Sequence, residues 1–214
     1  MLQRRLLRLC VGLSLLDLAL VGAFHLAFGR ASLDSLVWNL FLAWIPLIAA
    51  LALDDVRSTP LALNLPLLGF WLAFFPNAPY LVTELIHAND FGHGATGAVA
   101  VLALIAAASA GLALGFSSLL LVERSMRERF GARVALAISV ASLAAACVGI
   151  YLGRVLRLNT WDLLSRPRFV AALLHKHLLD PRPFAVTATI ALGMVLTALY
   201  LRFRRTVVPT GEEP

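Results

Sequence analysis

The sequence has few charged residues. Asp, Glu, Lys and Arg make up 14% of its 214 residues, whereas a soluble domain carries about 25%. Hydrophobic residues make up 60%. A soluble fold of this length needs far more polar surface, so the composition excludes that class. The scarcity of charge predicts an all-α integral membrane bundle.

Cysteine is also scarce, and the familiar cofactor motifs are missing. Cys10 and Cys147 fall in different predicted helices and lack metal-type spacing. The sequence has no nucleotide-binding loop, zinc-binding helix, nucleophile elbow or dinucleotide-binding glycine pattern. We therefore expect no cofactor and assign no metal ligands. Whether the protein is an enzyme stays open at this stage.

Lysine is nearly absent, yet the net charge is +6, because 17 of the 18 basic residues are arginines. These charges flank apolar blocks. This arrangement favours contact with anionic lipid head groups over contact with nucleic acid. We expect membrane lipids as partners and no nucleic acid; the oligomeric state is left open.

Long apolar runs dominate what is present. Six blocks have lengths near the roughly 20 residues that cross a bilayer core, and they predict transmembrane helices at 6–28, 33–53, 59–75, 95–122, 132–152 and 184–203. The first block is too long for a signal-peptide core and is interrupted by Asp17, so we expect an uncleaved first helix. We expect a single transmembrane domain over 1–214, with a polar tail at 204–214.

The distribution of basic residues predicts the orientation. With six spans, eleven basic residues share the side of both termini and seven lie on the other side. This count favours cytoplasmic termini. Six of the seven lie in the connection after the fifth block, which fits the rule poorly. Those charges therefore either have a role of their own or contradict the topology.

The stretch FPNAPYLVTELIHAND, residues 75–90, breaks the membrane pattern at two prolines. Pro76 cannot continue a helix, whereas Pro79 suits the first turn of a new one. Asn77 between them can turn the chain with its own side chain. We therefore expect the third block to end here and a short helix to start near Tyr80, either interfacial or re-entrant, over about 79–90.

Glu84 and His87 lie three residues apart on the polar face of this short helix. Three interpretations stay open: an ion pair of Glu84 with an arginine, a proton-transfer or catalytic pair, and a metal site needing further ligands. The candidate catalytic residues are Glu84 and His87.

A second polar stretch, IYLGRVLRLNTWD, follows the fifth block on the same side. Arg154 and Arg157 extend one helical face out of the membrane, as interfacial anchors, as a site for an anionic group, or as partners of Glu84 and Asp162. Beyond them, 167–179 reads as an amphipathic interfacial helix. The candidate binding residues of the two stretches are Asn77, Tyr80, Arg154, Arg157, Asn159, Trp161 and Asp162.

Asp17 lies near the middle of the first block. An ionisable group at that depth is costly, and suggests either a function or a hydrogen-bonded structural role. Small residues repeat every four positions in the fourth and fifth blocks, for example Gly111 and Gly115, and Gly149 and Gly153. Such repeats let helices approach closely, so we interpret them as structural.

Three stretches together suggest a family: FPNAPYLVTELIH, GIYLGRVLRLNTWD and WNLFLAWIPL, the last at 38–47. They resemble the bacterial membrane-protein family catalogued as domain of unknown function 1361, over roughly 30–203. Family members usually have Asp where this chain has Glu84. The resemblance implies a multi-pass protein of the bacterial inner membrane and implies no activity.

Three functions therefore compete. The first is a polar site on the non-cytoplasmic face that binds or modifies a lipid or isoprenoid phosphate. The second is a non-catalytic scaffold or assembly subunit, in which the polar stretches form an ion-pair latch. The third is a small transporter or channel that uses Asp17.

Overall fold

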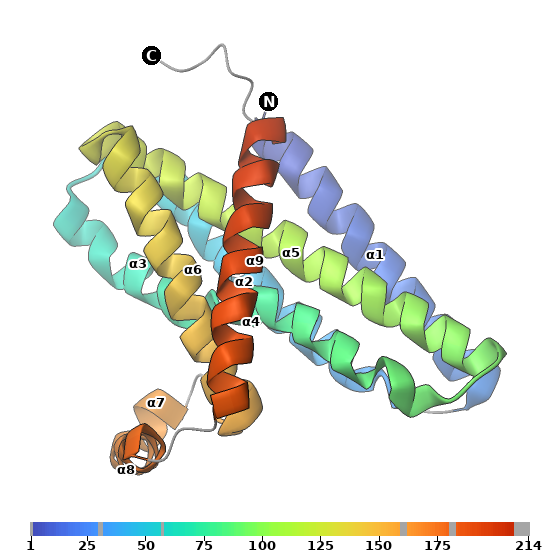
Figure 1. Ribbon diagram of the computed structural model, residues 1–214. Helices are drawn as coiled ribbons and strands as arrows, with labels where there is room; N and C mark the ends of the chain where they lie inside the picture. The colour runs from blue at the N-terminus through green and yellow to red at the C-terminus, as the bar shows by residue number, and fades with distance from the viewer. Residues whose placement is uncertain (1, 30–31, 57, 159–161, 180–182, 208–214) are drawn as a thin grey trace.

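The computed structural model describes residues 2–29, 32–56, 58–158, 162–179 and 183–207. These residues form a bundle that contains six helical segments long and apolar enough to cross a membrane (Figure 1). The prediction of an all-α integral membrane bundle is confirmed.

The long helices follow the predicted blocks. They are α1 (Leu2–Phe28), α2 (Asp34–Asp55), α3 (Leu61–Phe74), α5 (Ala95–Phe130), α6 (Ala132–Val155) and α9 (Pro183–Val207). Two shorter elements, α4 (Asn77–Tyr80) and the 3-10 helix η1 (Leu81–Phe91), extend the third span to residues 61–91. Two further short helices, α7 (Asp162–Ser165) and α8 (Pro167–Leu179), lie between α6 and α9.

The central element is α5, which is buried along most of its length. It packs against α1, α2, η1 and α6. Alanine and glycine dominate its sequence before residue 116, and these small side chains let the neighbouring helices approach closely. The helix ends at Gly131, whose φ of 82° is a left-handed conformation that favours glycine.

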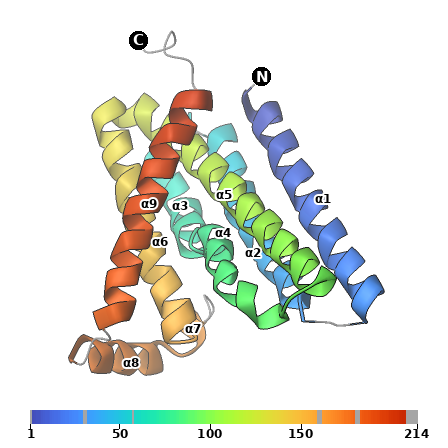
Figure 2. The same ribbon diagram turned by 45° about the vertical axis from the view of Figure 1, so that its right-hand side comes forward.

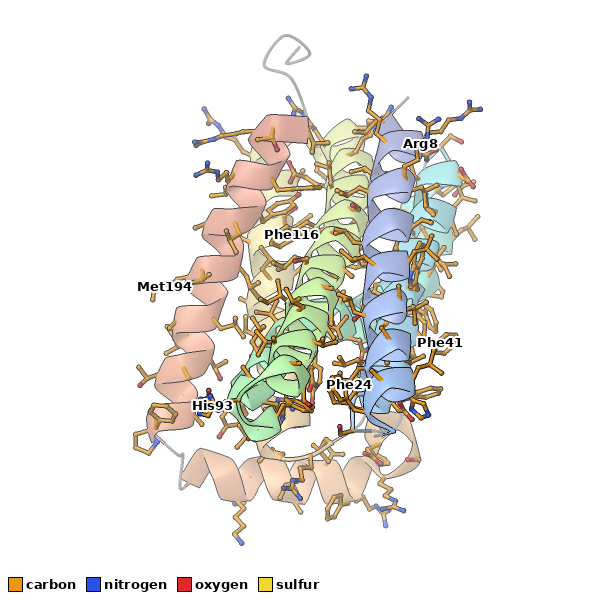
Figure 3. All side chains as sticks on the ribbon, turned by 90° about the vertical axis from the view of Figure 1, so that its right-hand side faces the viewer. Arg8, Phe24, Phe41, His93, Phe116 and Met194 are labelled. Carbon is orange, nitrogen blue, oxygen red and sulfur yellow. The ribbon has the colours of Figure 1, made fainter. Side chains whose placement is uncertain are left out.

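The two ends of the bundle differ in what they carry. Arg8 lies near one end and His93 near the other (Figure 3); we call these the Arg8 end and the His93 end. Helix α1 begins and α9 ends at the Arg8 end, whereas α8 lies across the His93 end (Figures 1 and 2). This course of α8 fits the predicted amphipathic helix at 167–179.

Helix α3 ends just before the two prolines, as predicted, and the third span bends there and continues. Ala78 donates a backbone hydrogen bond to Phe75 O at 3.2 Å, and Tyr80 donates one to Pro76 O at 3.0 Å. The Asn77 side chain donates to Phe74 O at 2.9 Å. This amide therefore satisfies a carbonyl near the bend, where the prolines supply no N–H. Helical turns continue through α4 into the separate 3-10 helix η1, which forms the end of the third span.

Two of the predicted small-residue positions explain where this bend sits. A Cβ atom added at Gly149 of α6 would lie 2.6 Å from Pro76 Cγ, and one added at Gly111 of α5 would lie 2.4 Å from Ala78 O. No side chain fits in either place. The glycines therefore admit the proline bend between α5 and α6, in addition to helix–helix packing.

Candidate functional site

The predicted polar residues of the third span lie along one face of α4 and η1. Asn77, Tyr80, Glu84 and His87 follow one another at intervals of three or four residues, which is helical spacing. Asn77 and Tyr80 line one cavity, and Glu84 and His87 line another. The polar face predicted from the sequence, with Glu84 and His87, therefore lines one cavity, and Asn77 and Tyr80 extend it to a neighbouring one.

Glu84 is the best-connected residue on this face and is buried. Its Oε1 atom accepts a hydrogen bond from Asn39 Nδ2 of α2 at 3.2 Å. Arg154 Nη2 of α6 lies 3.2 Å from the same oxygen, although it makes no aligned hydrogen bond there. Charge rather than hydrogen-bond geometry holds that pair. The structure thus brings together the two stretches that the sequence singled out.

Arg154 is held by two further contacts. Its Nε atom donates to Thr83 Oγ1 at 3.2 Å, and its guanidinium lies 4.7 Å from the centre of the Tyr80 ring, a cation–π distance. Its charge is therefore compensated by Glu84 and its orientation is fixed by the neighbouring side chains. The Arg154 guanidinium is therefore a poor candidate for binding a ligand.

A cavity of about 440 Å³ opens between α2, α3 and α6; we call it the α2–α6 cleft. Its volume is typical of a small-molecule site. Its apolar and small-residue lining comprises Trp38, Leu42, Leu72, Ala73, Pro76, Ala145, Val148, Gly149, Leu152, Gly153 and Leu158, and its polar lining comprises Asn39, Asn77, Tyr80 and Arg157. Trp38 is 54% exposed and so stands at the rim.

Arg157 supplies the charged group of the cleft. It follows the end of α6, with a φ of 55°. That left-handed conformation is uncommon for a residue with a side chain. The next residue, Leu158, donates a backbone hydrogen bond to Leu152 O at 3.1 Å and closes the helix end. Within the described ranges, no ion pair involves Arg157.

A second cavity of about 430 Å³, the η1 pocket, lies at the other end of the polar face. Its lining includes Ser32, Ser35, Glu84, His87 and Asp90. His87 Nδ1 lies 2.7 Å from Asp90 Oδ2, and both side chains are exposed. No group of three or more His, Cys, Asp or Glu suited to a metal ion occurs among the residues that the structure describes.

The remaining predicted residues lie elsewhere. Asn159 and Trp161 fall outside the described residues. Asp162 begins α7 and is half-buried, and it is not part of the described cleft lining. Asp17 is fully buried in α1, the helix at the opposite side of α5 from α6 (Figure 2).

Two residues of the site were not predicted from the sequence. Asn39 binds Glu84 and lines the cleft, and Trp38 stands at its rim. The stretch WNLFLAWIPL, which contains both residues, was nevertheless one of the three that suggested the family, and it was the available signal.

Comparison with known proteins gives the family. A family model described as "Protein of unknown function (DUF1361)" matches residues 38–199, well over half of the chain. The chain belongs to this family. The DUF1361 match begins at Trp38, on the rim of the cleft, and includes both of its walls. Helix α1 precedes it. No curated protein and no solved structure matches the chain.

The geometry of this DUF1361 protein suits binding better than bond-breaking chemistry. Glu84 is already occupied by Asn39 and Arg154, and His87 is turned to Asp90. The α2–α6 cleft instead combines an apolar lining with a cation that has no ion pair among the described residues. Such a site suits a molecule with an apolar body and an anionic group.

Proposed function

We propose that this protein binds a membrane amphiphile with a phosphate head group in the α2–α6 cleft. The apolar chain lies along α6, whose lining residues Ala145 and Gly153 are about 12 Å apart at about 1.5 Å per residue. The phosphate meets Arg157. Phospholipid and isoprenoid phosphate share this chemistry, and the experiment below distinguishes them.

The observation that carries the proposal is the difference between the two arginines. Arg154 is compensated by Glu84, whereas Arg157 lines the cleft and has no ion pair within the described part of the chain. A guanidinium presents a planar fork of donors that matches phosphate oxygens. Arg157 is therefore the cation available to a ligand.

The backbone at Arg157 gives a second reason. A left-handed conformation costs a residue with a side chain roughly 1–2 kcal/mol relative to the right-handed one, and glycine or asparagine usually occupies it. Here an arginine does. Strain of this kind often accompanies a functional side chain. In this case it ends α6 and leaves Arg157, an exposed residue, in the lining of the cleft.

For the location we propose the bacterial inner membrane, with both termini in the cytoplasm. The eleven-to-seven distribution of basic residues supports this orientation. The cleft then takes its head group from the non-cytoplasmic leaflet, where α8 also lies. The exposed Arg168 and Lys176 of α8 add positive charge at that surface.

The experiment is ligand retention measured by native mass spectrometry. The purified protein is offered dioleoyl phosphatidic acid against dioleoylglycerol, and geranylgeranyl phosphate against geranylgeraniol. We expect each phosphate to bind better than its neutral partner. If the protein also recognises the hydrocarbon chain of the lipid, only one of the two phosphates should bind. Arg157→Ala should weaken that binding about tenfold, because a hydrogen bond to a charged group contributes about 1.5–3 kcal/mol.

The matched control is Arg168→Ala, which removes an exposed arginine from α8 at the same end. It should leave retention nearly unchanged. Leu152→Trp should fill the cleft and weaken binding with Arg157 intact. Equal losses in the two arginine variants would mean that general surface charge, rather than the cleft, attracts the lipid. Equal binding of phosphates and alcohols would exclude phosphate recognition.

A further inference from the structure

Asp17 carries a carboxyl group in the middle of a membrane helix. It lies between Arg8 and Phe24 on α1, residues that Figure 3 places near opposite ends of the helix. Its exposed fraction is 0%. Neither of its two oxygens has a hydrogen-bond partner in the described part of the chain. It belongs neither to the α2–α6 cleft nor to the η1 pocket.

The helices packed on α1 bring no charge to Asp17. Cys10 contacts Ser117, so the antiparallel register places Asp17 near Ala110 of α5. No ionisable residue lies between Ala95 and Val122. On α2, the ionisable residues are Asp34, Asp54 and Asp55, at its two ends. The other ionisable group on this face of α1 is the Cys10 thiol, two turns away.

An ionised carboxylate in such a place is very unfavourable, because it loses water and gains neither a donor nor a cation. Something must neutralise it. Metal ions require several oxygen, nitrogen or sulfur ligands, and the described residues contain no group of three acidic, His or Cys side chains that could supply them. A proton needs no further ligand. The neutral acid can donate its O–H to a carbonyl of the preceding helical turn, as Ser and Thr do.

Among the described residues, the buried polar groups on this face of α1 lie between Asp17 and the Arg8 end. Ser14 and Cys10 lie on the same face of α1, one and two turns away. Trp44 Nε1 donates to Ser14 Oγ at 3.1 Å, and Cys10 Sγ lies 3.6 Å from Ser117 Oγ. At the helix start, Gln3 Nε2 donates to Asp54. We call Cys10, Ser14 and their partners the polar seam.

Toward the His93 end the same face of α1 is apolar. Val21 and Phe24 follow Asp17 and are buried. The Phe24 ring packs against Phe28 and Phe91, with ring centres 5.2 Å and 5.9 Å apart. This aromatic cluster separates Asp17 from the His93 end. The polar seam runs from Asp17 toward the Arg8 end as far as Cys10, and buried Leu6 lies on the same face between Cys10 and Gln3. Access to Asp17 is therefore one-sided.

We propose that Asp17 is a proton-binding site that exchanges its proton with the Arg8 end through the polar seam. The bound proton keeps α1 packed against α5, and its release requires α1 to loosen. Proton occupancy and the packing of α1 are thereby linked. This inference is independent of amphiphile binding, which uses other residues on the opposite side of α5.

Infrared spectroscopy of the full-length protein in lipid nanodiscs tests the proposal. A protonated carboxylic acid has a carbonyl stretch above the amide band, and the stretch shifts when deuterium replaces the proton. We expect such a band in the native protein, its loss in Asp17→Asn, and its slow shift in D₂O. The double substitution Cys10→Val/Ser14→Ala should slow that shift several-fold, because it removes the seam.

The control is Leu16→Ala, at a lipid-exposed position on α1, which should leave the rate of the shift unchanged. If Asp17→Asn fails to fold, Asp17→Glu should move the band instead of removing it. A native spectrum in which no band depends on Asp17 would overturn the proposal. So would a band that never shifts in D₂O, and an unchanged rate in the double variant would overturn the route.

Discussion

Glu84 compensates an arginine at the edge of the membrane bundle. One oxygen serves both Asn39 of α2 and Arg154 of α6, so a single side chain links two helices through η1. The sequence indicated an arginine partner as one of three interpretations. It offered Arg154 and Arg157 as candidate partners but could not decide among the interpretations, because 70 residues separate Glu84 from Arg154 and seven basic residues were predicted on that side.

We predict that Glu84→Ala lowers the free energy of unfolding by about 2 kcal/mol, because it leaves the Arg154 charge without its partner. This value lies below that of a fully buried pair, since Arg154 is 24% exposed. Unfolding in mixed micelles, titrated with dodecyl sulfate, measures it.

The control at this scale is His87→Ala. It removes an exposed pair with Asp90, which should contribute less than about 1 kcal/mol. If both alanine variants unfold at the same detergent fraction, the Glu84–Arg154 pair stabilises the fold no more than the exposed His87–Asp90 pair does.

At the scale of elements, the proline bend and the glycines of α5 and α6 form one packing unit. The sequence indicated both features separately, as a stop in the third block and as two small-residue repeats. It could not indicate that they meet. Pro76 lies over Gly149 and the Ala78 carbonyl lies over Gly111, and such contacts depend on how three spans pack together.

Gly149→Ala and Gly111→Ala should each destabilise the protein by about 1–3 kcal/mol, the usual cost of overpacking. Their added methyl groups would overlap Pro76 and the Ala78 carbonyl. The same detergent titration measures the loss.

Gly22→Ala is the matched control, because nothing lies within 4 Å of a Cβ atom there. Alanine is the better helix former by about 1 kcal/mol, so this variant should be as stable as the native protein or more so. If Gly149→Ala behaves like Gly22→Ala, the bend can move away from α6, and the close packing described above is not required.

At the scale of the whole molecule, α9 is held by a buried polar cluster around Glu123. Among the described residues of α9, only Leu196 and Tyr200 are buried. Tyr200 donates to Glu123 Oε2 at 2.5 Å, and Arg204 donates to Oε1 at 2.6 Å. Ser139 of α6 donates to the same carboxylate at 3.2 Å. One side chain of α5 therefore ties α9 and α6 together.

Removal of this carboxylate should loosen α9. Cys147 of α6 is 3% exposed and lies beneath α9, with its Sγ 3.4 Å from the position of a Cβ at Gly193. We predict that Glu123→Ala increases the rate at which a maleimide modifies Cys147 several-fold. Peptide mass spectrometry measures it.

Two controls accompany this measurement. Cys10, buried between α1 and α5, should react no faster in Glu123→Ala. Glu128→Ala removes an exposed acid of the same helix, paired with Arg124 at 3.7 Å, and should leave Cys147 protected. Equal protection of Cys147 in the native protein and in Glu123→Ala would mean that apolar contacts alone hold α9.

The apolar blocks were sufficient to predict the membrane class, the six spans and the polar face of η1. The physical reason is local: in lipid every backbone group must be bonded within its own segment, so length and apolarity specify a helix. The blocks could not predict the α2–α6 cleft, the Glu123 cluster or the isolation of Asp17. Those depend on which faces of distant helices meet. In a membrane, general hydrophobicity cannot select those faces, because the lipid tails are as apolar as the helices. Packing of small residues and individual polar contacts select them instead.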